Sequence, residues 1–104
     1  MLSEDQPKCG SIHASLQIIG DKWSGLIIRE LTGGSKRFTE LEAILGIGPR
    51  TLSQRLDFLE SQRIVTKQHF AEAPPRVEYS LTKKGADLLP ILRSMAVWGA
   101  KYTD

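Results

Sequence analysis

The stretch that decides the fold is GIGPRTLSQRLDFLESQRI, residues 46–64. Its leucines recur at Leu52, Leu56 and Leu59, which is the spacing of one buried stripe along a helix. The positions between them carry short polar and cationic side chains instead of the Glu and Lys of an ordinary solvated face: Arg50, Thr51, Ser53 and Gln54. The outer face of this predicted helix therefore needs an explanation beyond solubility.

The residues just before this helix predict a second, shorter one. RFTELEAILG, residues 37–46, has Thr39 and Glu42 three positions apart, the spacing of a reciprocal capping box, and Gly46 suits a left-handed C-terminal cap. A three-residue glycine turn leads to Pro49, and proline is favoured at the first position of a helix because its missing N–H costs nothing there. This order predicts a helix-turn-helix over about residues 39–61. A generic helical hairpin in a small bundle is the alternative on this segment alone.

The residues that follow favour a winged helix over a bundle. IVTKQHF, residues 64–70, is rich in β-branched and aromatic residues, and RVEYSLT, residues 76–82, alternates apolar and polar side chains. AEAPP lies between them and is typical of a hairpin tip. Two helices precede the motif, one over about residues 11–19 and one from a cap at Asp21 to Gly33–Gly34. We predict a mainly α fold with a small β-hairpin (α+β) at about residues 64–81, the winged helix-turn-helix.

Length and composition bound the remaining possibilities. The 104 residues predict a single domain, 1–104, and 40% hydrophobic with 25% charged residues are typical of a soluble globular protein. A net charge of +2 and a pI near 8.9 permit nucleic-acid binding without requiring it. No apolar run approaches the ~20 residues of a membrane span, and the polar N-terminus lacks a signal-peptide core. We expect a cytoplasmic, nucleoid-associated location and no membrane partner.

The sequence offers no strong candidate for catalysis or metal binding. A single cysteine, Cys9, excludes an internal disulfide framework and a multi-cysteine zinc site. His13 and His69 lack a partner at ligand spacing, so we expect no metal. Cys9 and His13 lie one helical turn apart, but no oxyanion hole or substrate pocket accompanies the pair. We expect no enzyme activity and no cofactor.

The outer face of the second motif helix has the chemistry to read base edges. Stepping 100° per residue from Leu52 places Arg50 and Gln54 nearly opposite the core. Arginine can donate to guanine, glutamine can pair with adenine, and serine or threonine can bind base or phosphate. Arg55 lies nearer the buried side, where a structural or phosphate-facing role is expected. The predicted DNA-binding set is Lys36, Arg37, Thr39, Pro49, Arg50, Thr51, Ser53, Gln54, Arg55, Lys67, His69 and Arg76.

Each of these residues has a duller interpretation beside the functional one. Any of the exposed cations could be a solvated surface residue, and Lys36 with Arg37 could form a plain loop. In the hairpin, Lys67, His69 and Arg76 could flank a groove or a phosphate, but Glu72 at the tip argues against deep insertion. A winged helix used for protein contacts is the rival function. It would need an apolar outer face, and Phe58 on one flank is the apolar residue there.

The last predicted helix, about residues 83–102, has more apolar surface than one small domain needs. It begins after the plausible cap Thr82 and contains Pro90, where we expect a kink or a break. Its stripe runs the full length of the helix: Leu88, Leu92, Met95, Trp98 or Gly99, and Tyr102. We expect a second subunit to cover part of this stripe. The alternative is that the helix packs across its own three-helix core.

The whole chain resembles the HxlR-type winged helix-turn-helix transcriptional regulators of bacteria and archaea. The resemblance covers nearly all of residues 9–103 and is carried by IGDKWSGLIIREL, KRFTELEAIL, GIGPRTLSQRLDFLE, PPRVEYSLTKKG and LLPILRSMAVWGAKY. The PPRVEYSLT wing and the helix entry with Gly20, Lys22 and Trp23 make it specific. One departure is Gly10, where members often have proline after the N-terminal cysteine.

The resemblance implies a homodimer that binds double-stranded DNA at a palindromic operator near the regulated gene, as a repressor or an activator. It implies that the first and last helices pair the subunits, which predicts an interface of Ile12, Leu16, Leu88, Leu92, Met95, Trp98 and Tyr102. RNA polymerase and a small-molecule or oxidant effector are left open as further partners. The resemblance also suggests that Cys9 senses oxidants or electrophiles; an ordinary thiol is the alternative.

Overall fold

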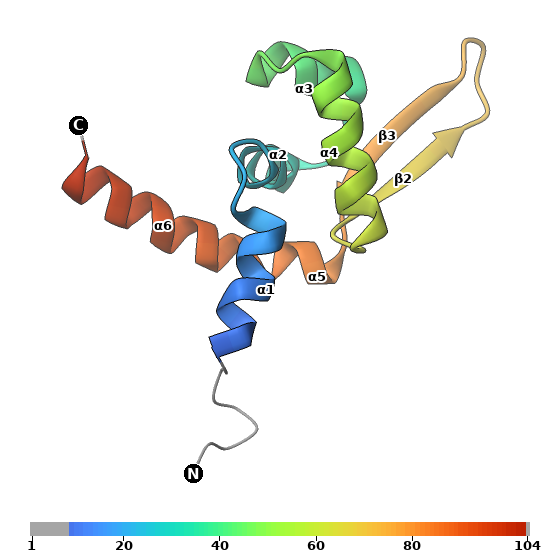
Figure 1. The fold of residues 1–104 in the computed structure, drawn as a ribbon. Coiled ribbons are helices and arrows are strands. Elements are labelled where there is room, and N and C mark those ends of the chain that lie inside the picture. Colours follow the sequence, from blue (N-terminus) through green and yellow to red (C-terminus); the bar gives the residue numbers. More distant parts are fainter. Residues whose placement is uncertain (1–8, 104) are drawn as a thin grey trace.

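The computed structural model describes residues 9–103, with side chains from Gly10 onward. Its elements follow in the order α1 (Cys9–Ile19), α2 (Ser24–Glu30), the 3-10 turn η1 (Leu31–Gly33), β1 (Lys36–Arg37), α3 (Phe38–Leu45), α4 (Pro49–Ser61), β2 (Val65–Phe70), β3 (Arg76–Leu81), α5 (Lys83–Ala86) and α6 (Leu89–Tyr102). This order confirms the predicted mainly helical winged helix-turn-helix (Figure 1).

The turn between α3 and α4 has the predicted backbone geometry. Gly46 adopts the left-handed conformation, with φ of 64°, and its N–H donates to the Glu42 carbonyl at 2.9 Å. A residue with a Cβ would be strained there, which is why glycine suits the position. Pro49 begins α4, and the Leu52 N–H donates to the Gly48 carbonyl at 2.9 Å. The predicted start of the long helix is confirmed.

The predicted capping box of α3 is wrong, because the observed one lies two residues earlier in the chain. The helix begins at Phe38, so Thr39 lies inside its first turn and does not cap it. The carboxylate of Glu40, rather than that of Glu42, accepts the backbone N–H of Arg37 at 2.8 Å. The physical reason is the short strand β1, which holds Arg37 in an extended conformation and fixes the helix start immediately after it.

One hydrophobic core joins α2, the helix-turn-helix and the base of the sheet. Its fully buried apolar side chains are Ile27 and Ile28 of α2, Leu41 of α3, Leu52, Leu56 and Leu59 of α4, and Ile64 and Val65 at the start of β2. Burying each such side chain stabilises the fold by about 1.5–3 kcal/mol. All three leucines of the predicted α4 stripe are therefore anchors that fix the rotation of this helix about its axis.

The sheet has three antiparallel strands in the order β1-β3-β2, one more than the sequence predicts. β2 and β3 form the predicted hairpin, with Val65 opposite Leu81 and Phe70 opposite Arg76. β1 adds two residues to the other edge of β3, with Lys36 opposite Tyr79 and Arg37 opposite Glu78. A strand of two cationic residues has no apolar alternation, so sequence patterns do not predict it.

The C-terminal segment is two helices, so the single helix predicted for residues 83–102 is wrong. Thr82 caps α5 as predicted, since its hydroxyl accepts the Gly85 N–H at 3.0 Å. The expected break is present, but it falls at Asp87–Leu88, before Pro90 instead of at it. Pro90 then lies in the first turn of α6, where its missing N–H removes no helical hydrogen bond.

The joint at the base of the wing leaves no room for a side chain at Gly85. This glycine is buried, and a Cβ on it would collide with the carbonyl oxygen of Ile64. The hydroxyl of Thr82 donates to the carbonyls of Arg63 and Ile64, at 2.5 and 3.1 Å. The end of α4, the start of β2 and the start of α5 are thereby tied together at one point.

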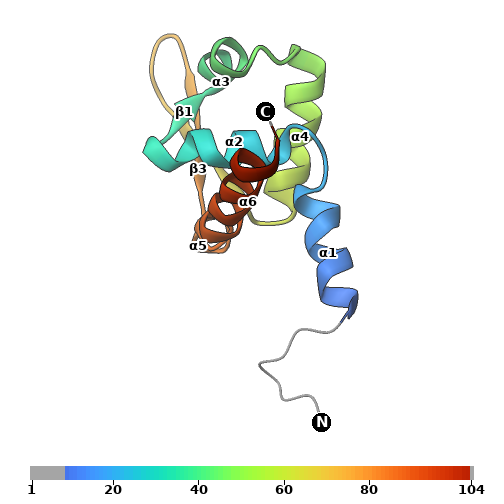
Figure 2. The same ribbon diagram turned by 90° about the vertical axis from the view of Figure 1, so that its left-hand side faces the viewer.

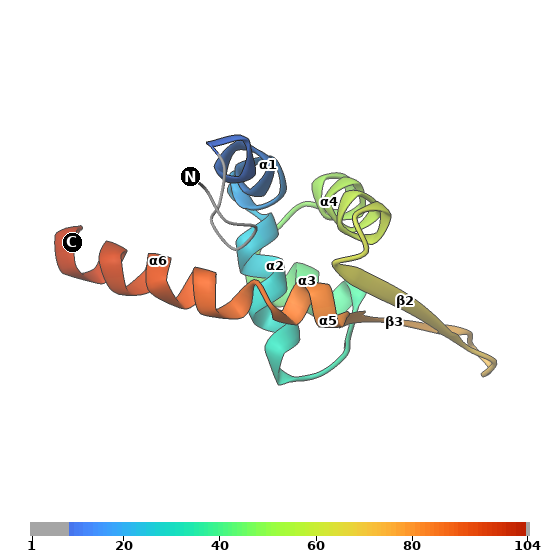
Figure 3. The same ribbon diagram turned by 90° about the horizontal axis from the view of Figure 1, so that it is seen from below.

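The elements project from the core in three directions. α4 and the β2–β3 wing lie on one side, while α6 extends to the opposite side and α1 points downward (Figure 1). In the view turned by 90°, α6 lies in front of the core and points toward the viewer (Figure 2), and the view from below shows α6 and the wing pointing in opposite directions (Figure 3). Among the described residues, no helix is long and apolar enough to cross a membrane.

Candidate nucleic-acid interface

The outer face of α4 is exposed along the half of the helix that the sequence singles out. We call Pro49, Arg50, Thr51, Ser53 and Gln54 the reading face; all five are exposed, while Leu52 behind them has 0% exposure. None of the reading-face side chains makes a hydrogen bond or an ion pair with another residue in the described range 9–103. The donors and acceptors of this face therefore point outward from a rigid backing.

Charge is distributed unevenly along the outer face of α4. Arg50 stands at its beginning, whereas the acidic Asp57 and Glu60 lie exposed toward its end. No side chain caps the first turn, so the backbone N–H groups that follow Pro49 also face outward at the positive end of the helix dipole. These charges attract the phosphate backbone of a nucleic acid to the first half of α4 and repel it from the second half.

Arg55 is engaged within the protein, which favours the structural one of its two predicted roles. Its guanidinium lies 3.1 Å from the Asp21 carboxylate and 4.7 Å from the centre of the Phe58 ring. The Asp21 contact is an ion pair without aligned hydrogen-bond geometry. Arg55 also covers the flank of Phe58, the apolar residue on which the protein-contact alternative depended.

Asp21, the partner of Arg55, is also the residue that the sequence predicts as the cap of α2. It pairs with Arg55 and accepts hydrogen bonds at the start of α2. One carboxylate oxygen accepts the backbone N–H groups of Trp23 and Ser24 at 2.9 and 3.0 Å, which confirms the predicted cap. Burial alone would raise the pKa of Asp21, but hydrogen bonds from Ser24 and Trp23 and the charge of Arg55 together lower it below 3.8. The carboxylate is thus held ionised at the corner between α1 and α2.

Of the three side chains that the sequence predicts as DNA contacts on the wing, His69 is exposed, and Lys67 and Arg76 are half-buried. Side chains alternate along β2, so Lys67 and His69 share the face of the strand that carries the core residue Val65. The Lys67 ammonium lies 6.0 Å from the centre of the Tyr79 ring. The pKa of Tyr79 is raised mainly by burial, with Lys67 opposing and the acids Asp57 and Glu60 of α4 adding to the increase. The charges of Lys67 on the wing and of Asp57 and Glu60 on α4 therefore all act on the Tyr79 hydroxyl.

The third wing cation, Arg76, is neutralised by its own hairpin. Its guanidinium lies 3.3 Å from Glu72 and 3.1 Å from Glu78, and it stacks 4.2 Å from the centre of the Phe70 ring. Glu78 also accepts the hydroxyl of Ser35 at 2.6 Å. Arg76 is therefore part of an ion-pair network that holds the wing in shape, and its charge is not available to a DNA phosphate.

The remaining predicted DNA contacts lie on the other edge of the sheet. Lys36 is half-buried, whereas Arg37 and Thr39 are exposed at the junction of β1 and α3. The structure keeps Arg55 and Arg76 in internal contacts, and the reading face and the wing strands β2 and β3 belong to the same side of the fold (Figure 1). Sequence patterns did not reveal the Asp21–Arg55 and Arg76–Glu78 pairs, because side-chain pairing across elements has no periodicity to detect.

The predicted dimer residues divide into an exposed group and a half-buried group. Ile12, Leu16, Met95, Trp98 and Tyr102 are 50–63% exposed in the protomer, and the Trp98 and Tyr102 ring centres are 5.3 Å apart. Leu88 and Leu92 instead are half-buried and pack against the core, and their contact with a second copy stays a prediction. Ile91 joins the exposed group, and we call Ile91, Met95, Trp98 and Tyr102 the α6 stripe.

The described residues contain no group of three or more His, Cys, Asp or Glu side chains placed to hold a metal ion. The predicted regulatory residue, Cys9, is the first residue of α1, but its side chain lies outside the part of the chain that the structure describes.

Comparison with known proteins places these features in a family. The HxlR-like helix-turn-helix family matches residues 18–104. The HTH-type transcriptional regulator YvaP of Bacillus subtilis (strain 168) is 39% identical over 97 residues, which cover 92% of this chain and 90% of YvaP.

Two solved structures are also similar. The redox regulator HypR in its oxidized form superposes with a TM-score of 0.84 and 38% identity, over 89% of this chain and 97% of HypR. The reduced form of the transcriptional regulator YodB from B. subtilis gives a TM-score of 0.84 with 33% identity, over 94% and 97% of the two chains. The family match and these similarities, together with the winged fold, show that the chain belongs to the HxlR-like helix-turn-helix family.

Proposed function

We propose that this chain is a homodimeric transcriptional regulator that binds double-stranded DNA at a pseudo-palindromic operator in the cytoplasm, as a repressor or an activator. The observation that carries the proposal is the reading face, which is exposed, free of internal partners and backed by buried leucines. In a helix-turn-helix the N-terminal part of the second helix enters the major groove. The description of its relatives as transcriptional regulators supports the same function.

Base recognition is assigned to Arg50 and Gln54, because their side chains lie nearly opposite the buried Leu52. Arg50 can donate two hydrogen bonds to guanine, and Gln54 can pair with adenine. Thr51 and Ser53 on the flanks contact base or phosphate. Since phosphate contacts carry no sequence information, specificity depends on the first two residues.

Phosphate binding is assigned to Lys67 and His69 on the wing and to Lys36 and Arg37 at the other edge of the sheet, with Thr39 and Pro49 approaching the DNA backbone. Each neutralised phosphate releases counterions, so operator affinity falls steeply as salt rises. Arg55 and Arg76 contribute by holding α4 and the wing in shape, since their charges are already paired.

Dimerisation is assigned to α1 and the α6 stripe. These helices project away from α4 and the wing, so a second copy can cover their apolar residues without blocking the DNA face (Figures 1 and 3). Two-fold symmetry then places two α4 helices about one DNA turn apart, ~34 Å, or a multiple of it.

Oxidant control is assigned to Cys9. HypR is described as a redox regulator, and this chain has one cysteine, at the start of α1. A helix N-terminus favours the thiolate. Oxidation can form a disulfide with the second copy or with a small thiol, each sulfur losing its proton and the oxidant taking two electrons. Replacing Cys9 with Ser is expected to make DNA release insensitive to diamide.

A fluorescence-anisotropy titration tests the DNA-binding proposal. Labelled duplex from the region upstream of the gene is compared with a scrambled duplex, at low and physiological salt with reductant present. Arg50→Ala is expected to cost about 1–3 kcal/mol on the upstream duplex and to relax discrimination at one base position. Lys83→Ala is the matched control, because it also removes one positive charge. The Lys83 ammonium lies on α5 and is already paired with Asp87 at 2.7 Å.

Binding of the Arg50→Ala protein equal to that of the parent on both duplexes would show that the reading face is assigned wrongly. Absence of binding even at low salt would favour a protein-contact module instead.

A further inference from the structure

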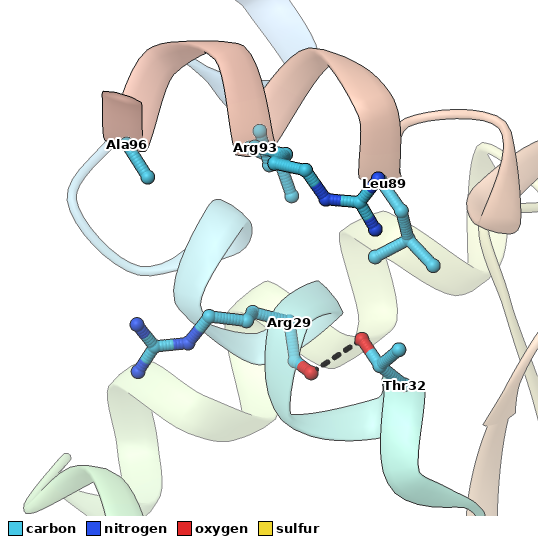
Figure 4. A pocket seen from close by; sticks show the side chains of 6 residues that line it. Arg29, Thr32, Leu89, Arg93 and Ala96 are labelled. Carbon is cyan, nitrogen blue, oxygen red and sulfur yellow. Dashed lines mark hydrogen bonds between the residues drawn. The ribbon is translucent and has the colours of Figure 1, made fainter. Parts of the chain in front are cut away.

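A groove between α2 and α6 has no part in the proposed DNA contacts. It has a volume of about 330 Å³ and is lined by Arg29, Thr32, Leu89, Leu92, Arg93 and Ala96 (Figure 4). A second hollow of about 230 Å³ continues it toward the α1–α2 corner and shares Arg29, Leu92 and Ala96. We call the two together the α2–α6 groove. Its first part alone lies at the lower end of the volumes that bind small ligands.

The groove and the α6 stripe occupy different faces of the same helix. Stepping 100° per residue along α6 separates the mean direction of Leu89, Leu92, Arg93 and Ala96 from that of the α6 stripe by roughly 140°. Met95, at the edge of the stripe, also lines the second hollow. A second copy that covers the α6 stripe therefore leaves the first part of the groove, at Leu89 and Arg93, open to solvent, whereas the second hollow borders the stripe at Met95.

The walls of the groove are apolar, and its charged rim is mainly positive. Leu89, Leu92 and Ala96 supply the apolar surface from α6. Arg29, Arg93 and Lys22 supply cations, whereas Asp21 is the carboxylate among the lining residues and is already occupied by Arg55 and α2. An anion in the groove would meet attractive charge without displacing an existing pair.

The two arginines at the groove are weakly engaged. Arg93 makes no ion pair with any residue in the described range 9–103, and Arg29 lies 3.4 Å from its chain neighbour Glu30 with 67% of its side chain exposed. Figure 4 shows the Arg93 side chain lying along the groove toward Leu89, while Arg29 extends from α2 in the other direction. The Thr32 hydroxyl is turned to the Arg29 carbonyl at 2.5 Å, so it does not offer its proton to the groove.

We propose that the α2–α6 groove binds a small amphipathic carboxylate, with its apolar body against Leu89, Leu92 and Ala96 and its carboxylate against Arg93, aided by the field of Arg29. Guanidinium and carboxylate groups form strong charge-assisted hydrogen bonds, and these orient a ligand whose remaining contacts are apolar. The proposal goes beyond DNA binding and does not depend on it, because the groove belongs to the protein without DNA.

The experiment uses three probes that share one apolar body and differ in charge: 4-phenylbutyrate, 4-phenylbutanamide and 4-phenylbutylamine. Each is titrated into the full chain labelled with 15N and 13C-methyl groups, and NMR shifts give both the affinity and the location. We expect 4-phenylbutyrate to bind with a Kd on the order of 1 mM or tighter, with the largest shifts at Leu92, Ala96 and Thr32. The amide is expected to bind about tenfold more weakly, and the amine more weakly still.

Three variants locate the charge and the cavity. Arg93→Gln is expected to remove about tenfold of the affinity for 4-phenylbutyrate and the preference for it over the amide. Ala96→Leu fills the groove and is expected to abolish binding of all three probes. Lys101→Gln is the matched control, since it removes one exposed cation from the end of the same helix, outside the groove, and is expected to leave the affinity unchanged.

Equal binding of 4-phenylbutyrate and its amide would overturn the proposal, as would an unchanged affinity in Arg93→Gln. Shifts centred on α4 or the wing, or no saturable binding, would do the same. Binding that weakens as the protein concentration is raised would mean that a second copy occupies the groove, which also overturns it. Because the readout involves no DNA, each result is independent of the operator titration.

Discussion

The outer face of α4 and the α6 stripe are both exposed, but they differ in chemistry and in what holds them. α4 buries three leucines to between 0% and 1% exposure behind a face of polar and cationic residues. α6 has no buried residue, and its exposed face is apolar and aromatic. The outer face of α4 is polar and rests on a packed core, which suits a charged and hydrated partner. The α6 stripe is apolar and uncovered in the protomer, which suits contact with a second copy of the chain.

The largest expected effect comes from removing the backing of α4. Leu56→Ala deletes a fully buried side chain and should lower the free energy of unfolding by about 2–5 kcal/mol. Urea denaturation followed by circular dichroism measures it. Asp57→Ala, at the next and exposed position, should stay within about 0.5 kcal/mol. Equal losses in the two variants would mean that α4 is not held by its leucines.

The next effect should appear at the α6 stripe. Trp98→Glu places a charge among exposed aromatic and apolar side chains and should weaken dimerisation by about 2–4 kcal/mol, as for an interface hot spot. Sedimentation velocity over a concentration series measures it. Ala100→Glu introduces the same charge on the opposite face of α6 and should leave the dimer intact. A dimer that survives Trp98→Glu would show that α6 is not its interface.

Salt should separate the two surfaces. Lys67→Ala should weaken DNA binding for all sequences alike and reduce the slope of log affinity against log salt by about 1 for each protomer. The measurement is the anisotropy titration at several salt concentrations from about 50 to about 200 mM. Dimerisation through the apolar stripe should change little over that range. A slope equal to that of the parent protein would place Lys67 away from phosphate.

The smallest expected effect concerns the ion pair behind the reading face. The pKa of Asp21 is lowered in the folded protein, so its ionised form stabilises the fold above pH 3.8. This contribution is lost as the pH falls through the folded pKa. Asp21→Asn keeps the cap and removes the charge, so it should cost about 0.5–1 kcal/mol near neutral pH. The gap between parent and variant should close below pH 3.8.

Unfolding free energies measured at stepwise lower pH check this prediction. The control is Asp87→Asn, which removes an exposed carboxylate paired with Lys83 and should cost less than Asp21→Asn at every pH. A gap between parent and Asp21→Asn that widens on acidification would contradict the sign.

Periodic features of this protein could be read from its sequence, and contacts between distant elements could not. The α4 stripe, the Gly46 cap and the hairpin follow from local spacing, so their bounds were predicted closely. β1 cannot be predicted from local spacing, because its two residues form a strand only by pairing with β3. The start of α3 was misplaced for the same reason, since β1 fixes Arg37 and hence the role of Glu40.

The candidate site was predicted in the same uneven way. The reading face follows from helical geometry and needs no knowledge of other elements. Arg55 and Arg76 could not be judged from spacing, because their partners lie in another element or across the wing, and their availability depends on those carboxylates. The sequence left open whether the apolar stripe of the last helix packs on its own core or on a second copy, and the structure shows Leu92 against the core of the protomer.

The break at Asp87–Leu88 gives the protein a mechanical arm. The 14 residues of α6 make a rod of about 21 Å that begins at this break, and the short helix α5 separates it from Thr82, whose hydroxyl ties the wing to α4. If the backbone rotates by about 10° at the break, the far end of the rod moves by about 4 Å. In a two-fold dimer each protomer contributes such a rotation, so a small change at one joint is doubled in the distance between the two α4 helices.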